Sequence, residues 1–204
     1  AAWADVSDAR IAAEISALTG EISQVPSAVS AIKVDGRRAY DRVRAGEEVV
    51  LDARNVVVSR FDVVGDRAGD GIRDLDVIVD CSSGTYIRSL ARDLGAALGV
   101  GGHLTALRRT RVGSFDVANA VDIDSLEGAP VLTPAQAAEL ILPVLSVSAE
   151  EARDLRHGKR LTGQAGRIDA PLVAAIDDEG VLVGVVEKRG GDLKSAMNMP
   201  ESAR

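Results

Sequence analysis

Two stretches of the chain repeat their apolar residues at the three- and four-residue spacing of an amphipathic helix. The first runs from Val6 to Leu18, with Ser7 or Asp8 placed to cap its start and Gly20 to end it. The second begins at Tyr86 and ends at a glycine-rich segment. Its apolar stripe consists of Ile87, Leu90, Ala91, Leu94 and Leu98. Both patterns predict helices that bury one face.

A second periodicity, with apolar residues at every other position, predicts strands between these helices. Residues 49–64 are rich in valine, and the segment from Leu75 to Cys81 alternates apolar with mostly acidic positions. The polar, glycine-containing segment 66–71 predicts the turn that joins the two strands. Cys81 falls on the apolar face of its strand, where a cysteine is usually part of the core.

The last third of the chain has its own pattern. A segment with Gly128 and Pro130 predicts a linker, and helices are expected at residues 134–142 and 148–156. Two apolar runs, 172–176 and 181–186, flank a polar turn and predict a β-hairpin. The tail from residue 190 onward shows no clear pattern, and we expect it to be disordered.

These elements together predict the fold class. Strands mixed with single helices, without regular βαβ repetition, indicate an α+β fold with a mixed or antiparallel sheet. We expect a larger domain over residues 1–128, a linker at 129–133 and a small, mostly β domain at 134–204.

Composition narrows the functional classes. A hydrophobic content of 46% indicates a packed core, and no apolar run approaches the ~18 residues of a membrane helix. The N-terminus lacks the pattern of a signal peptide, and the lone Cys81 excludes an intrachain disulfide, which fits a reducing cytoplasm. Two histidines and one cysteine form no recognisable metal-binding set, so no metal is expected.

The net charge and the distribution of charged residues point in opposite directions about nucleic acid as a partner. The formal net charge of −7 argues mildly against it, because phosphate binding usually leaves a basic surface. Arginines nevertheless cluster within one short stretch of the chain, at Arg88, Arg92, Arg108, Arg109 and Arg111. Such a cluster is able to bind RNA on an acidic protein, or it is an ordinary solvated surface. Charge alone leaves both readings open.

The segment CSSGTYIRSLARDLG, residues 81–95, carries the most chemistry. It predicts a strand, a glycine-containing turn and a helix, with Tyr86 and Arg88 at the first helical turn. Free backbone amides and the positive end of the helix dipole favour an anion there, and an arginine can hold a carboxylate or phosphate with two hydrogen bonds. The plainer reading is a strand-to-helix connection with a surface arginine.

Three long stretches together resemble the bacterial tRNA pseudouridine synthase B family. These are QVPSAVSAIKVDGRRAYDRVRAG at residues 24–46, the segment 81–95, and LGVGGHLTALRRTRVGSF at residues 98–115. Long motifs in the same order along the chain are far more specific than one short match. The resemblance is strong over residues 21–115 and continues weakly into a C-terminal segment similar to a PUA-type RNA-binding domain.

The resemblance implies a function and a role for each candidate residue. The family isomerises the T-loop uridine of tRNA to pseudouridine without a cofactor or metal, on a base flipped out of the RNA. It implies that Arg88 pairs with and orients the catalytic aspartate, that Tyr86 contacts the flipped base and that Leu107 lines its pocket. Phosphate contacts are expected from Arg108, Arg109 and Arg111. The implied partner is the T stem-loop of tRNA, and the protein is expected to be a cytoplasmic monomer.

One departure from the family bears on catalysis. The family's aspartate lies in a G-x-L-D-P-x-A-x-G element, and these 204 residues contain no Asp-Pro pair. We therefore expect the chain to be a fragment, carrying the central and C-terminal part of the family and inactive alone. The alternative is a non-catalytic RNA-binding module that keeps the tRNA-docking surface.

Overall fold

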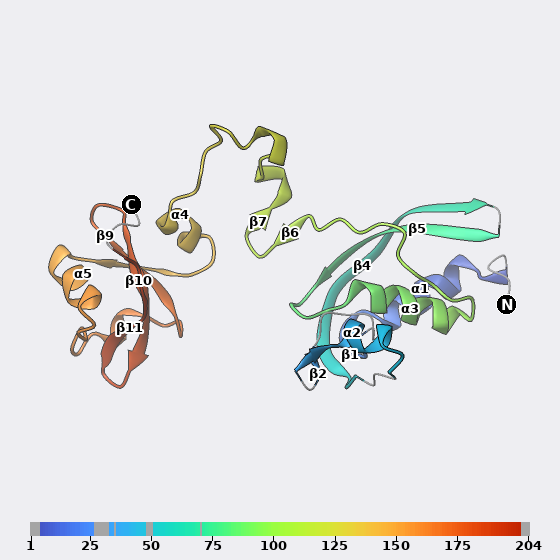
Figure 1. Cartoon of the computed structure of the whole chain (residues 1–204), viewed down its shortest axis with the longest axis horizontal. Coiled ribbons are helices and arrows are strands. Elements are labelled where there is room, and N and C mark those ends of the chain that lie inside the picture. The colour runs from blue at the N-terminus through green and yellow to red at the C-terminus, as the bar shows by residue number, and fades with distance from the viewer. Residues whose placement is uncertain (1–4, 27–32, 35, 48–50, 70, 201–204) are drawn as a thin grey trace. The chain divides into compact units, whose positions relative to one another are not determined.

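A computed structural model of the chain describes residues 5–26, 33–34, 36–47, 51–69 and 71–200. The chain divides into two compact units, residues 1–107 and residues 108–204. Each unit combines helices with largely antiparallel sheets, which confirms the α+β prediction (Figure 1). Throughout the ranges just given, no helix has both the length and the apolar character to cross a bilayer. The domain boundaries predicted from the sequence stay a prediction.

The first unit is built on a three-stranded antiparallel sheet in the order β1–β4–β5 (Figure 1). Its strands are β1 (Gly20–Gln24), β4 (Arg54–Gly69) and β5 (Ile72–Cys81). The predicted turn at residues 66–71 is wrong for most of its length, because both strands continue through it. Its polar side chains do not interrupt the ladder, since they lie exposed and pair across it, as Arg67 does with Asp76.

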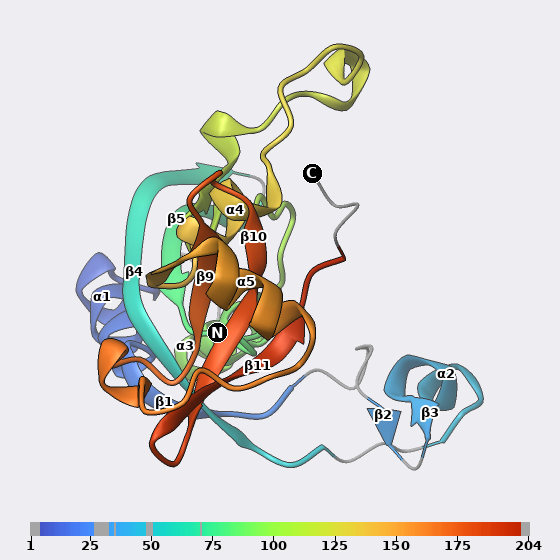
Figure 2. The same cartoon turned by 90° about the vertical axis from the view of Figure 1, so that its left-hand side faces the viewer.

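Two helices cover this sheet, α1 (Asp8–Ala17) and α3 (Ile87–Leu98), and both predicted helices are confirmed. Ser7 caps α1, because its Oγ accepts a hydrogen bond from the Arg10 amide at 3.3 Å. The core between sheet and helices consists of Val6, Ile11, Ile15, Val58, Phe61, Leu90, Leu94 and Leu98. A separate small piece consists of α2 (Ala39–Arg44) and the short hairpin of β2 (Lys33–Val34) and β3 (Arg37–Arg38), all labelled in Figure 2.

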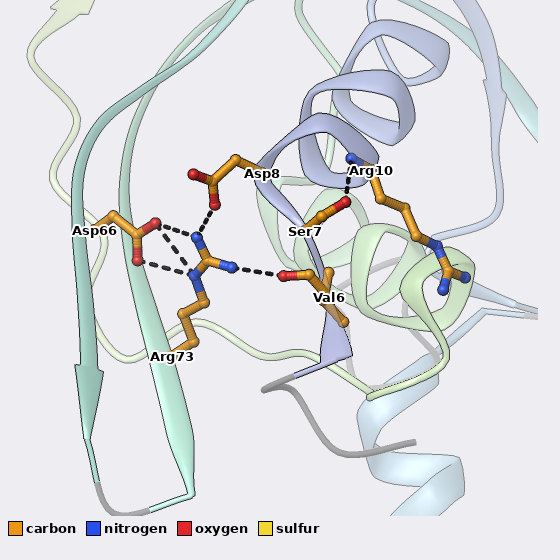
Figure 3. Close-up of polar contacts among 6 residues, drawn as sticks. All are labelled: Val6, Ser7, Asp8, Arg10, Asp66 and Arg73. Carbon is orange, nitrogen blue, oxygen red and sulfur yellow. Dashed lines mark hydrogen bonds and ion pairs between the residues drawn. The ribbon is translucent and has the colours of Figure 1, made fainter.

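Arg73 ties the start of α1 to the β4–β5 hairpin (Figure 3). Its guanidinium donates to both carboxylate oxygens of Asp66, to the Asp8 carboxylate and, at 2.9 Å, to the Val6 carbonyl. The side chain of Arg73 is only 16% exposed, although it lies among polar groups. The hydrogen bonds from Arg73 lower the pKa of Asp66 below its ordinary value of 3.8. One arginine thus fixes the helix start on the hairpin.

The chain leaves α3 by folding back across the helix at very short range. Gly99 ends α3 with a φ of +77°, and the amides of Val100 and Gly101 both donate to the Gly95 carbonyl. A Cβ added to Gly95 would lie 2.2 Å from the carbonyl carbon of Gly101. Glycine at 95 is therefore a steric requirement of this crossing, which positions the segment 103–107.

The second unit contains a four-stranded sheet in the order β11–β10–β9–β8. Its strands are β8 (Val144–Val147), β9 (Val173–Asp177), β10 (Leu182–Arg189) and β11 (Asp192–Asn198), and only β8 and β9 pair in parallel. The helices α4 (Pro134–Glu139) and α5 (Ala149–Arg156) both begin with capping boxes. The predicted hairpin of β9 and β10 is confirmed.

One feature of the second unit differs from the sequence prediction, and several short elements add to it. The tail expected to be disordered forms β11, because Leu193 is fully buried in the core and its strand pairs with β10. A small hairpin of β6 (Arg111–Val112) and β7 (Phe115–Asp116) precedes this fold, followed by 3-10 turns at Val117–Asn119 and Ile123–Ser125. A further 3-10 turn covers Ala165–Arg167.

Candidate functional site

The candidate site lies where β5 ends and α3 begins. The connecting segment 82–85 is fixed to β4 through Ser82, whose amide donates to the Val57 carbonyl at 2.8 Å. The Ser82 Oγ in turn accepts from the Val57 amide at 2.9 Å. Gly84 takes a φ of +87°, so the tight turn before the helix requires a residue without a side chain. The connection therefore presents the first turn of α3 from a fixed position.

Gln24, the last residue of β1, holds the residue at the start of α3. Its Oε1 accepts a hydrogen bond from the Tyr86 amide at 2.7 Å, and its Nε2 donates to the Tyr86 carbonyl at 3.1 Å. The Gln24 side chain is buried, with an exposed fraction of 2%. A buried side-chain amide whose oxygen and nitrogen both form hydrogen bonds is a stable structural connection.

The residue after Gln24 is bound by two further side chains of the same helix, Ser89 and Arg92. The Ser89 Oγ donates to the Val25 carbonyl at 3.1 Å, and the Arg92 Nη2 donates to the same carbonyl at 2.7 Å. Two of the sequence motifs, the one beginning at Gln24 and the one containing Tyr86, thus meet at one junction. Residues 27–32 of the first motif lie outside the described residues.

Tyr86 and Arg88 share the first turn of α3, as the sequence predicted. Tyr86 is the N-cap residue and is half-buried, whereas Arg88 is exposed. Among residues whose placement is described, none forms an ion pair with Arg88. The first turn of α3 contains no acidic residue, and no side chain caps it. The positive helix end and the guanidinium therefore add to one another, which favours a carboxylate or phosphate.

The remaining predicted residues are also exposed. Leu107 ends the first unit with an exposed fraction of 63%. Arg108, Arg109 and Arg111 belong to the second unit and are exposed there. Arg111 lies in β6, where its Nη1 donates to the Gly113 carbonyl at 3.4 Å. Their assigned contacts with RNA and with the base stay predictions.

Two further observations concern groups outside this junction. Cys81 is exposed, so the prediction that it belongs to the core is wrong. It is the last residue of β5, and the apolar face of the strand has left the core by that point, because Val79 is the last residue of the strand that packs on it. Within the described part of the chain, no group of three potential ligands is placed to hold a metal ion.

Sequence reasoning missed Gln24 and Ser89, the two buried polar residues of the junction. Periodicity does not reveal them, because their partners are backbone groups more than 60 residues away in the chain. The available signal was the position of Gln24 at the head of the first motif, directly before Val25 and Pro26.

Comparison with known proteins accounts for nearly the whole chain. Residues 1–87 match the N-terminal domain of the TruB family pseudouridylate synthases. Residues 88–147 match the tRNA pseudouridylate synthase B C-terminal domain, and residues 142–200 match the tRNA pseudouridine synthase II C-terminal domain. The chain belongs to the TruB family of pseudouridine synthases. The resemblance found in the motifs is thereby confirmed.

Individual relatives support this assignment. The chain is 57% identical over 203 residues to the tRNA pseudouridine synthase B of Leifsonia xyli subsp. xyli, covering 98% of this chain and 67% of that protein. It is 54% identical to the tRNA pseudouridine synthase B of Corynebacterium aurimucosum, covering 91% of this chain and 62% of the relative. The chain thus spans between three fifths and about two thirds of the length of these TruB relatives.

Solved structures show the same fold at low identity. A Cbf5–Nop10–Gar1 complex matches with a TM-score of 0.66 and 22% identity, covering 98% of this chain and 64% of the matched chain. An H/ACA ribonucleoprotein bound to a substrate RNA containing 2'-deoxyuridine matches with a TM-score of 0.66 and 23% identity, covering 97% of this chain and 63% of the matched one. At this identity, the likeness establishes the fold of the TruB chain.

Proposed function

We propose that the full-length protein isomerises the T-loop uridine of tRNA to pseudouridine. The observation that carries this proposal is the junction at α3, where Tyr86 and Arg88 share the first helical turn. Gln24 binds Tyr86 there and so brings two long family motifs together. Membership of the TruB family and the names of the close relatives agree with this chemistry.

In this proposal each predicted site residue has a distinct task. The guanidinium of Arg88 pairs with the catalytic aspartate of the family's G-x-L-D-P element and fixes its orientation. Tyr86 contacts the uracil once it is flipped out of the RNA, and Leu107 contributes an apolar wall. The bond between the ribose and N1 of the base breaks, the base turns, and the ribose is joined to C5, which loses its proton.

We expect RNA to be bound mainly by arginine side chains and by the second unit. We place Arg108, Arg109 and Arg111 against phosphates of the T stem-loop, where arginine forms charge-assisted hydrogen bonds. The small β-rich fold of residues 134–204 acts as a PUA-like RNA-binding domain. The protein works as a cytoplasmic monomer and needs neither cofactor nor metal.

Pseudouridine formation in unmodified tRNA tests this function directly. We expect the full-length protein to modify the T-loop uridine, and the 204-residue chain alone to give no turnover, because it contains no Asp-Pro element to supply the aspartate. Sequencing of the treated tRNA after chemical derivatisation of pseudouridine locates the product. Turnover by the 204-residue chain, in proportion to its concentration, would show that the reaction does not need that element.

The same experiment separates the proposal from a binding-only protein. Full-length protein that binds tRNA but forms no pseudouridine would be an RNA-binding module that keeps the family's surface. Binding is measured by filter retention or by fluorescence anisotropy of labelled tRNA. The salt dependence of that binding reports how many phosphates are contacted.

A further inference from the structure

We propose that Gln24 is a positioning residue for the reaction, acting through the backbone of Tyr86. This inference rests on the proposed function, in which Tyr86 and Arg88 contact the base and the aspartate. Gln24 itself faces neither, because it is buried at the end of β1 with both amide groups bonded to Tyr86.

The two hydrogen bonds fix two successive peptide planes. The amide of Tyr86 belongs to the peptide that joins it to Thr85, and its carbonyl belongs to the peptide that joins it to Ile87. Gln24 grips one group from each at 2.7 and 3.1 Å. Rotation of either plane would break one of these bonds. The direction in which the Tyr86 side chain leaves the backbone is therefore set from β1.

The same grip reaches Arg88 through the start of the helix. The Tyr86 carbonyl also accepts hydrogen bonds from the amides of Ser89 and Leu90, at 2.9 and 3.1 Å, which close the first turn. Since no side chain of its own caps α3, Gln24 is what orients this carbonyl from outside the helix. Arg88 lies inside the turn so formed, and its backbone position follows that of Tyr86.

Ser89 provides a matched comparison within the same junction. Its side chain is also buried and also joins α3 to the end of β1, but its hydrogen bond goes to the Val25 carbonyl. Ser89→Ala removes a bond between the same two segments without touching the backbone groups of Tyr86. Gln24→Met keeps the length of the side chain and removes both bonds to Tyr86.

The test compares these two variants in the full-length protein by three measurements. For Gln24→Met we expect the Tyr86 amide to exchange its hydrogen at least ~10-fold faster, because its acceptor is gone. We expect the single-turnover rate at saturating enzyme to fall by ~10²-fold, as for a misplaced catalytic group, with the dissociation constant for tRNA unchanged within about twofold. Ser89→Ala should keep both the Tyr86 protection and the rate.

Each outcome decides the question. If the Tyr86 amide hydrogen exchanges at an unchanged rate in Gln24→Met, Gln24 does not hold the Tyr86 backbone. If the single-turnover rate falls equally in both variants, Gln24 contributes only to stability. If the unaltered protein forms no pseudouridine, the proposed function fails. The exchange measurement still decides in that case whether Gln24 holds the start of α3.

Discussion

Arg88 is the residue whose chemistry is most sharply testable. Its guanidinium is exposed at the positive end of α3. We expect Arg88→Lys in the full-length protein to lower the single-turnover rate by ~10²-fold, because lysine keeps the charge but loses the planar fork that orients a carboxylate. Affinity for tRNA should change little, since attraction between charges survives. Single-turnover kinetics at saturating enzyme measure the rate.

Arg109 gives the contrasting outcome for the same experiment. Arg109→Ala should weaken tRNA binding and reduce its dependence on salt concentration before it affects the chemical step. A wild-type single-turnover rate for Arg88→Lys would show that Arg88 does not orient the aspartate. A loss of binding equal to that of Arg109→Ala would instead make Arg88 a phosphate contact.

Arg73 yields a prediction about pH and stability. Replacing Arg73 by methionine should lower the urea midpoint of the first unit at about pH 7, because three acceptors lose their donor. The pKa of Asp66 is lowered in the folded chain, so its ion pair stabilises the fold above the ordinary value of 3.8 and is lost as pH falls through the lowered pKa. The difference between the variant and the parent should therefore shrink as the pH falls below 3.8.

Arg67 is the matched control on the same hairpin. It pairs with Asp76, but both side chains are more than half exposed, so water screens the pair. Arg67→Met should leave the urea midpoint almost unchanged at either pH. An equal effect of both substitutions would mean that the contact of Arg73 with α1 adds no stability beyond that of an exposed ion pair.

At the residue scale, the sequence predicted which side chains are exposed and polar better than it predicted their hydrogen-bond partners. Tyr86 and Arg88 were found because the turn before a helix is a recognisable place for a site. Cys81 was misplaced because alternation continues one step beyond the last residue that touches the core. Gln24 was missed because its hydrogen-bond partner is a backbone group, and nearly every residue has the same backbone groups, so the sequence does not indicate which one is bound.

At the scale of elements, the crossing at the end of α3 makes a strong prediction. Gly95→Ala should destabilise the first unit by ~1–3 kcal/mol or more, because the added Cβ would meet the Gly101 backbone at 2.2 Å and backbone yields poorly. Gly69→Ala is the control, since a Cβ there meets nothing within 4 Å. Urea titrations of both variants decide the point, and equal midpoints would show that the crossing is easily displaced.

The strand β11 makes the second prediction at this scale. Leu193→Ala should destabilise the second unit by ~2–5 kcal/mol, because its side chain is fully buried in the core. Met197→Ala on the same strand should cost little, since Met197 is 51% exposed. Thermal unfolding followed by circular dichroism measures both. A tail that contributed nothing to the core would show no difference between them.

Elements were predictable from sequence where one face is clearly apolar. Helix α3 buries an apolar stripe at helical spacing, whereas β9 and β10 are short, nearly continuous runs of buried residues on either side of a polar turn. Strand β11 was missed because Leu193 is its only buried residue, and an edge strand gains its order from pairing with β10. Strand β1 was missed because Gly20, expected only to end the preceding helix, is the first residue of the strand.

At the scale of the whole molecule, the chain contains separate cores. Those of the second unit draw only on residues between Ala135 and Met199. We therefore expect the fragment 108–204 to fold by itself and to unfold in one cooperative transition. Unfolding transitions that have the same midpoint by circular dichroism and by hydrogen exchange would establish this. Gradual, non-cooperative melting would show that the fragment depends on the rest of the chain.

Net charge was the least informative whole-molecule property. A value of −7 argued against nucleic acid, yet the chain belongs to a family named for the modification of RNA. Acidic residues are spread across both units, many in pairs with arginines such as Arg73 with Asp66 and Arg156 with Asp177. A sum over the chain does not show which cations remain available, and that depends on the three-dimensional arrangement.

The exposure of Cys81 makes the chain ready for site-specific labelling. It is the only cysteine in the sequence and lies at the end of β5, with the segment 82–85 between it and Tyr86. A maleimide dye would therefore attach at one defined point beside the candidate site without any engineered substitution. Quenching or energy transfer to a dye on the T loop would then follow docking of the RNA in real time.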